Sequence, residues 1–111
     1  MSVTSGCLIV QLTVELYDDL MDDLQMAILS RVKKESLKGL VLDLSSLQVI
    51  DSYTCNLIVD TIKMVQLLGI QSIVVGLRPG IVASIIDLNV DTRNIRTALN
   101  LENAIELINS K

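Results

Sequence analysis

Apolar and polar residues alternate along the beginning of the chain, and this period of two is typical of a strand with one buried face. The alternating apolar positions are Leu8, Val10, Leu12 and Val14. Apolar residues then recur at helical spacing from Leu20 to Val32, which predicts an amphipathic helix. Asp18 and Asp19 are candidate caps at its start, and the basic residues at its end suit the helix dipole.

Two short apolar runs, Leu40–Leu44 and Ile73–Val75, predict strands that are buried on both faces. Between them, apolar residues at helical spacing predict a helix that begins near Ser52 and stops at Gly69. The residues expected to face the sheet from this helix are Cys55, Ile58, Val59, Ile62 and Val65.

The last third of the chain continues the alternation of strands and helices. Pro79 is expected in the first turn of a helix that extends to Leu88, because proline is tolerated there. Asn89 can take the left-handed conformation that ends a helix. A short strand at Thr97–Leu99 and a helix over 101–108 complete the prediction. Alternating strands and helices predict an α/β fold with one sheet and helices on at least one face.

A length of 111 residues fits one domain, so residues 1–111 are expected to form a single unit with its core over about 8–108. Half of the residues are apolar, yet Trp and Phe are absent, so Leu, Ile, Val and Met must build the core. The mean hydropathy of +0.55 is high for a small domain, which keeps much of its surface in water. Some apolar surface is therefore expected to contact partner subunits.

The net charge of −4 and the lack of a large basic cluster argue against a nucleic acid partner, because phosphate backbones require a concentrated positive surface. No apolar run reaches the roughly 18 to 20 residues that span a bilayer, and the first residues lack the pattern of a signal peptide. We therefore expect a cytoplasmic protein without a membrane partner.

The sequence offers little for catalysis or metal binding. The chain has no histidine, the commonest general base and transition-metal ligand. The aspartates at 18, 19, 22 and 23 fit the polar start of a helix better than a metal site, whose ligands usually converge from a loop. Cys7 and Cys55 fit no CxxC or zinc pattern, so we expect two buried free thiols. The sequence predicts no enzyme, cofactor or metal site.

The five glycines form no phosphate-binding loop of known spacing. The turn Gly76-Leu77-Arg78-Pro79-Gly80 joins a strand to a helix, and an arginine at a helix start can hold an anion. We interpret the turn mainly as a structural connection, with Arg78 as a candidate contact for an anion or a protein partner.

The pair Asp51-Ser52 lies at the start of the central helix. Serine is a favoured N-cap, and its distance from Cys55 puts Ser52 at or next to that position. A phosphate on its hydroxyl would also suit a helix start, whose free N–H groups and positive dipole end favour negative charge. The same phosphate would repel Asp51 and any apolar or acidic partner. Modification of Ser52 would thus leave the fold intact and break a complex.

The segment VLDLSSLQVIDSYTCNLIVDTIKMVQLLGIQSIVVGLRPGIVASIIDL resembles the central part of a STAS domain, the anti-anti-sigma-factor fold, in which an Asp-Ser or Asp-Thr pair opens the second helix. VVGLRPGIVASIIDLNVD and RTALNLENAIELI are similar to the stressosome branch of that family, in particular to its short single-domain scaffold proteins. The resemblance covers about Leu8 to Ile108. It implies a single STAS domain, with a small mixed sheet covered by about four helices, in a bacterial stress-response pathway.

The resemblance also implies roles for named residues and partners. Ser52 matches the family's phosphorylated serine, and Asp51 matches the acid that precedes it. The implied function is a scaffold that assembles with RsbR-type STAS paralogues and retains an RsbT-type serine/threonine kinase until Ser52 is phosphorylated. Tyr53 and Thr54 depart from the phenylalanine and small residues typical after the acceptor. Thr54 is therefore a candidate second acceptor.

A second apolar stripe runs along the central helix at spacing i, i+4, i+7 and i+11. It consists of Leu57, Thr61, Met64 and Leu68. A helix that is apolar on two faces is buried on two faces. We expect this stripe, together with Tyr53, to dock another STAS subunit or the kinase. The alternative is burial under a neighbouring helix of the same chain.

Two other functions stay open at this level. One is a stand-alone anti-anti-sigma factor, a monomer or dimer that binds an anti-sigma kinase directly. The other is a sensor of a small anion or nucleotide held near Arg78 and the start of the following helix.

Overall fold

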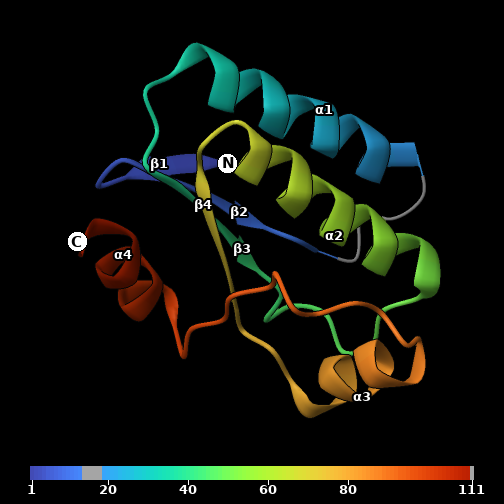
Figure 1. The fold of residues 1–111 in the computed structure, drawn as a ribbon. Helices are drawn as coiled ribbons and strands as arrows, with labels where there is room; N and C mark the ends of the chain where they lie inside the picture. The colour runs from blue at the N-terminus through green and yellow to red at the C-terminus, as the bar shows by residue number, and fades with distance from the viewer. Residues whose placement is uncertain (14–18, 111) are drawn as a thin grey trace.

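The computed structural model of the protein contains a four-stranded sheet with helices on both faces (Figure 1). The structure describes residues 1–13 and 19–110. In chain order the elements are β1 (Ser2–Thr4), β2 (Cys7–Gln11), α1 (Asp19–Lys34), β3 (Gly39–Asp43), α2 (Ser52–Leu67), β4 (Gln71–Val75), α3 (Pro79–Asp87) and α4 (Leu101–Asn109).

The strands lie in the order β1-β2-β3-β4. β1 is antiparallel to β2, whereas β2, β3 and β4 are parallel, so the sheet is mixed as expected. Gln11, Asp43 and Val75 stand in register at the ends of the three parallel strands. The carboxyl ends of β3 and β4 therefore lie side by side, and the connections to α2 and α3 begin there.

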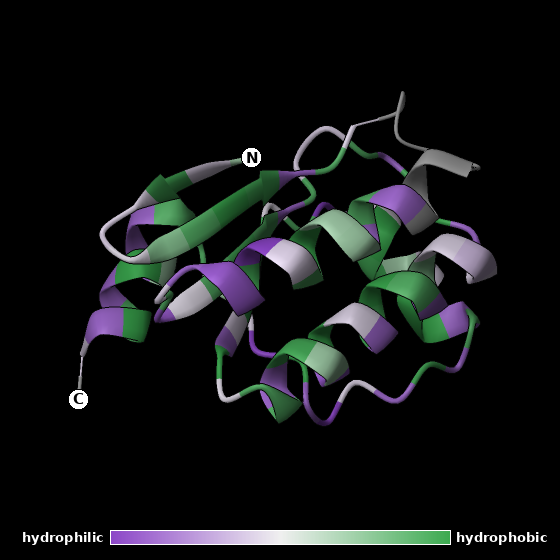
Figure 2. Ribbon diagram, turned by 90° about the horizontal axis from the view of Figure 1, so that it is seen from above, coloured by the Kyte–Doolittle hydropathy of each residue, from purple (hydrophilic) through white to green (hydrophobic). Residues whose placement is uncertain are grey.

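Two apolar clusters lie on opposite faces of the sheet. One packs α1, α2 and Ile81 of α3 against one face, and the other packs α4 against the opposite face. Along β4, Val74 belongs to the first cluster, whereas Ile73 and Val75 belong to the second. This explains the continuous apolar runs of the central strands, which are buried on both faces. Figure 2 shows apolar residues along these strands and mixed polarity on the helices.

The predicted elements are confirmed in type, with local differences. β2 ends at Gln11, before the predicted strand end at Val14, which lies outside the described residues, as does Asp18. β1 was not predicted because its three residues are exposed and carry no apolar pattern. The expected strand at Thr97–Leu99 is reduced to one parallel bridge between Thr97 and Val74. Asn89 has a φ of 55° and ends α3 as predicted.

Cys7 and Cys55 are free, buried thiols, as the sequence predicted. They lie in the clusters on opposite faces of the sheet, so they do not face each other. Burial raises the pKa of both thiols, because the thiolate loses its hydration in apolar surroundings. These groups are therefore packing residues in the folded state.

Candidate functional site

The connection from β3 to α2 is held in place by residues at the end of β3 and between β4 and α3. Asp43 Oδ1 accepts a hydrogen bond from the Ser45 N–H at 2.9 Å, and Arg78 Nε donates to the Ser45 carbonyl at 2.9 Å. Gly76 has a φ of +76°, and a Cβ at this position would lie 2.7 Å from Asp43 Oδ1. A side chain at Gly76 would thus displace the bonds that fix the connection.

The start of α3 supports the same connection from its other side. A Cβ at Gly80 would collide with the carbonyl oxygen of Gln48, so only glycine lets α3 approach this closely. Leu47 and Ile50, on either side of Gln48, bury their side chains in the core. The short segment that leads to Asp51 is therefore anchored by apolar packing and by close backbone contact.

Asp51, not Ser52, is the N-cap of α2. Its backbone is extended, with φ −90° and ψ 172°, and its Oδ1 accepts the Thr54 N–H at 2.8 Å. The Asp51 carbonyl accepts the Cys55 N–H at 2.9 Å, which begins the helical bonds. Ser52 thus lies next to the cap position rather than at it, because the preceding Asp51 makes the capping bond, and Asp caps a helix as well as Ser does. Ser52 is the first helical residue, and its side chain is exposed.

Thr54 is only 1% exposed, and its Oγ1 has no hydrogen-bond partner. A kinase acts on an accessible hydroxyl, so phosphorylation of Thr54 would require the start of α2 to open. Thr54 as a second acceptor stays a prediction, and the folded structure favours Ser52 over it.

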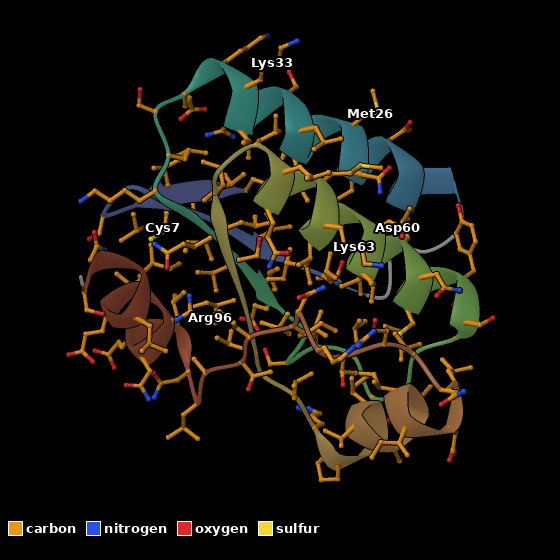
Figure 3. The ribbon with its side chains drawn as sticks, in the orientation of Figure 1. Cys7, Met26, Lys33, Asp60, Lys63 and Arg96 are labelled. Atoms are coloured by element: carbon orange, nitrogen blue, oxygen red, sulfur yellow. The ribbon has the colours of Figure 1, made fainter. Side chains whose placement is uncertain are left out.

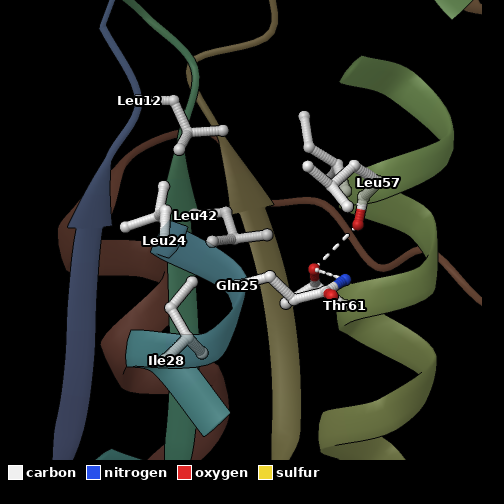
Figure 4. Close-up of a pocket in the computed structure, with 8 residues that line it drawn as sticks. Leu12, Leu24, Gln25, Ile28, Leu42, Leu57 and Thr61 are labelled. Carbon is white, nitrogen blue, oxygen red and sulfur yellow. Dashed lines mark hydrogen bonds between the residues drawn. The ribbon is translucent and has the colours of Figure 1, made fainter. Parts of the chain in front are cut away.

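The second stripe of α2 divides into a covered and an open part. Leu57 and Thr61 lie against α1, where they line a small cavity with Leu24 and Gln25 (Figure 4). Gln25 Nε2 donates to Thr61 Oγ1 at 2.9 Å, and Thr61 Oγ1 donates to the Leu57 carbonyl at 2.7 Å. Burial under a neighbouring helix therefore accounts for both residues, and neither offers a free docking surface.

The remaining residues of the predicted docking surface are open. Met64 on α2 and Leu68, the C-cap of this helix, are exposed, and Tyr53 is 50% exposed beside Ser52. Leu67, which the pattern did not single out, is the most exposed apolar residue of this helix at 88%. An apolar surface thus remains along α2, although it differs from the predicted stripe.

Arg78 is exposed and precedes the first turn of α3 without a side-chain capping bond. Its Nε is directed to the Ser45 carbonyl, so it stabilises the connection to α2. Its further role as an anion or partner contact stays a prediction. No His, Cys, Asp or Glu cluster with metal-binding geometry occurs among the described residues. Within residues 1–13 and 19–110, no helix has the length and apolar character needed to cross a membrane.

The chain belongs to the STAS domain family, which matches residues 1–104. The RsbT co-antagonist protein RsbRD of Bacillus subtilis (strain 168) is 29% identical over 105 residues, which are 95% of this chain and 38% of RsbRD. RsbRB of the same organism, also named an RsbT co-antagonist, is 32% identical over 72 residues, which are 65% of this chain and 26% of RsbRB. The chain therefore spans well under half of the length of these relatives.

Solved structures share the fold. A serine-to-glutamate variant of Moorella thermoacetica RsbS has a TM-score of 0.85 at 24% identity, with 95% of this chain and 89% of that chain covered. A chain from the stressosome, described as a signal integration and transduction hub, has a TM-score of 0.86 at 24% identity, with 96% and 93% covered. The expected STAS fold and its likeness to the stressosome branch are thereby confirmed.

Proposed function

We propose that this protein is an RsbS-like stressosome scaffold of the anti-anti-sigma type that retains a serine/threonine kinase and releases it when Ser52 is phosphorylated. The protein itself catalyses no reaction in this proposal, and ATP and Mg²⁺ belong to the kinase. It acts in the cytoplasm, in an oligomer with other STAS domains. The proposed partners are RsbR-type STAS paralogues and an RsbT-type kinase.

One observation carries the proposal: Ser52 is exposed as the first residue of α2, directly after the residue that caps this helix. The hydroxyl is not needed for the capping bond, which the Asp51 carboxylate makes to the Thr54 N–H. The connection before it is fixed by the bonds of Asp43 and Arg78 to Ser45. A kinase would therefore find this hydroxyl at a fixed, open position in the folded state.

The charges near Ser52 favour a switch that leaves the fold intact. Phosphoserine carries about −1.5 to −2 charges at neutral pH, and the positive end of a helix dipole favours negative charge. The first turn of α2 contains no acidic residue, so within this turn the added charge meets the dipole, with the Asp51 carboxylate directly before it. A partner docked on Tyr53 and the start of α2 would meet this charge directly, with the cost of its desolvation.

The relatives support the choice of partners. RsbRD and RsbRB are named as co-antagonists of RsbT, and one structure of similar fold comes from the stressosome. Exposed apolar residues on α2, including Met64 and Leu67, provide surface for contacts between subunits. A scaffold needs such surface, because the proposed function consists entirely of binding.

The first experiment is intact-mass and peptide mass spectrometry after incubation with Mg²⁺-ATP and an RsbT-type kinase. We expect one phosphate on Ser52, none on the Ser52→Ala variant, and unchanged modification of Thr54→Val. Modification of Thr54 alone, or an unmodified protein, would contradict the proposed acceptor.

A second experiment measures retention of the kinase by size-exclusion chromatography with RsbR-type paralogues present. Ser52→Ala is expected to hold the kinase in the presence of ATP, whereas Ser52→Asp is expected to release part of it. Equal retention by the two variants would argue against release by charge. A complex no larger than a dimer bound to the kinase would favour a stand-alone anti-anti-sigma factor.

A further inference from the structure

A small cavity of about 30 Å³ lies where α2, α3 and the sheet meet. Every described residue that lines this cavity is apolar. A space of roughly 10 to 15 Å³ for the centre of a water-sized sphere admits one water molecule, so this cavity has room for a small molecule. Its lining includes Leu44 and Val74 on the sheet side, Cys55 and Val59 of α2, Ile85 of α3 and Ile95 of the loop after α3.

The lining of the cavity is unsuited to water. Its only polar side-chain group is the Cys55 thiol, which is a weak hydrogen-bond donor. In the described part of the chain, the buried side-chain oxygens without a partner belong to Thr54 and Ser72, and neither residue lines the cavity. A buried water typically makes about two to four hydrogen bonds. The cavity therefore suits an apolar occupant.

The inner and outer walls of the cavity differ in how firmly they are packed. Leu44, Val74 and Cys55 are at most 3% exposed and belong to the core cluster that packs α1 and α2 on the sheet. On the outer side, Ile85 and Ile95 are only partly buried, and Ile81 is the one buried residue of α3. A displacement of α3 and the loop after it would therefore admit a ligand without disturbing the inner wall.

The loop after α3 runs along α2, on the side where Lys63 is labelled in Figure 3. Gln66 Nε2 of α2 donates to the Asn94 carbonyl at 3.2 Å, directly before Ile95 of the cavity wall. This bond is exposed, and exposed bonds open at a lower free energy than the packed core does. The outer wall thus has a defined closed position and a means of opening.

We propose that this cavity binds one small, uncharged apolar molecule, of about the size of a noble-gas atom or a light hydrocarbon. Atoms around a void lack contact partners on one side, and an apolar ligand would restore these dispersion contacts. A polar or charged ligand would lose its hydration without gaining a hydrogen-bond partner. Ligand binding would also favour the closed position of α3 and its loop by mass action. The site does not depend on phosphorylation of Ser52.

The cavity between α1 and α2 provides an internal comparison. It is smaller, at about 20 Å³, and its lining includes the hydrogen-bonded side chains of Gln25 and Thr61. An apolar ligand there would contact polar groups that already bond to each other. We therefore expect a probe to prefer the cavity beneath α3.

The test is methyl NMR of the ¹³C-labelled protein under increasing xenon pressure, with helium at equal pressure as the control. We expect saturable shifts of the methyl signals of Val59, Ile85 and Ile95. The methyl signals of Leu24 and Ile28, which line the smaller cavity, are expected to shift weakly and without saturation. The absence of saturable shifts at Val59, Ile85 and Ile95, or equal shifts in both cavities, would overturn the proposal.

Variants that change the volume of the cavity test its position. Val59→Ile adds a methylene group inside the cavity and should abolish the saturable xenon shifts of Ile85 and Ile95. Val32→Ile is the matched control, because it adds the same group to the core cluster away from the cavity and should retain the shifts. Ile85→Val enlarges the cavity and should strengthen xenon binding.

Circular dichroism verifies the fold of each variant. Unchanged xenon binding by folded Val59→Ile, or an equal loss in Val32→Ile, would refute the site. Weaker binding by folded Ile85→Val would also contradict it.

Discussion

The Asp51 Oδ1 accepts a hydrogen bond from the Thr54 N–H at 2.8 Å, and this bond caps the helix that begins with Ser52. Asp51 and Ser52 have separate roles at the proposed switch. Asp51 satisfies a free N–H of the helix start, and Ser52 leaves its side chain exposed. Modification of the serine therefore need not disturb the bond that holds the helix end.

Asp51→Ala should lower the free energy of unfolding by about 1 kcal/mol, because the Thr54 N–H loses its capping acceptor. Asp51→Asn keeps a capping oxygen and removes the charge, so it should retain most of the stability. Urea denaturation followed by circular dichroism measures both. A loss of the same size in both variants would show that charge, not the cap, is responsible.

Ser52→Ala should change the free energy of unfolding by no more than about 0.5 kcal/mol, since an exposed first helical residue makes no capping bond. The measurement is the same urea titration, with Asp51→Ala as the comparison. A loss near 1 kcal/mol would restore Ser52 as the residue that caps α2. The result also decides whether kinase assays on Ser52→Ala can be interpreted without a correction for stability.

Thr54→Val should leave stability unchanged or raise it by about 1 kcal/mol. The valine keeps the shape of the side chain and removes a buried hydroxyl that has no partner. Thermal unfolding by calorimetry detects the change, and Thr61→Val is the matched control. The hydroxyl of Thr61 bonds to Gln25 and to the Leu57 carbonyl, so its removal should destabilise the protein.

The two parts of the α2 stripe should respond differently to a charged substitution. Leu57→Asp should cost about 2 to 4 kcal/mol, because it puts a carboxylate into the apolar contact with α1. Met64→Lys should change stability by no more than about 0.5 kcal/mol and weaken association with other STAS domains. Urea titration and analytical ultracentrifugation measure the two effects. An unfolded Met64→Lys variant would contradict the exposure of that residue.

The thiols of Cys7 and Cys55 should react slowly with a disulfide reagent in the native protein and rapidly in urea. Burial raises the pKa of both, and the thiolate is the reactive form. In the unfolded chain they ionise near pH 8.5, so their contribution to stability is complete below that pH. It should decline as the pH rises toward the folded pKa. Rapid labelling of the native protein would contradict the burial.

The element types followed from local patterns of the chain. Continuous apolar runs at Leu40–Leu44 and Ile73–Val75 predicted strands buried on both faces, and helical periodicity predicted the helices around them. These patterns persist in the structure because a strand or helix exposes fixed sets of positions, whatever packs against them. β1 was not predicted, because its three residues are exposed and carry no such pattern.

The support of Ser52 could not be read from the sequence. Asp43 at the end of β3 and Arg78 before α3 bond to Ser45, and Gly80 contacts the Gln48 carbonyl. The glycines were the one signal of this arrangement, but a glycine does not reveal which backbone approaches it. Whether Asp51 or Ser52 caps α2 also depended on the residue at which the connection from β3 ends and the helix begins.

Which residues of the second stripe are buried is decided only by the tertiary structure. Leu57, Thr61, Met64 and Leu68 share one helical pattern, which correctly groups them along the helix. α1 covers Leu57 and Thr61, whereas Met64 and Leu68 remain exposed. Periodicity determines which residues share a face, but the path of another helix determines how much of that face is left for a partner.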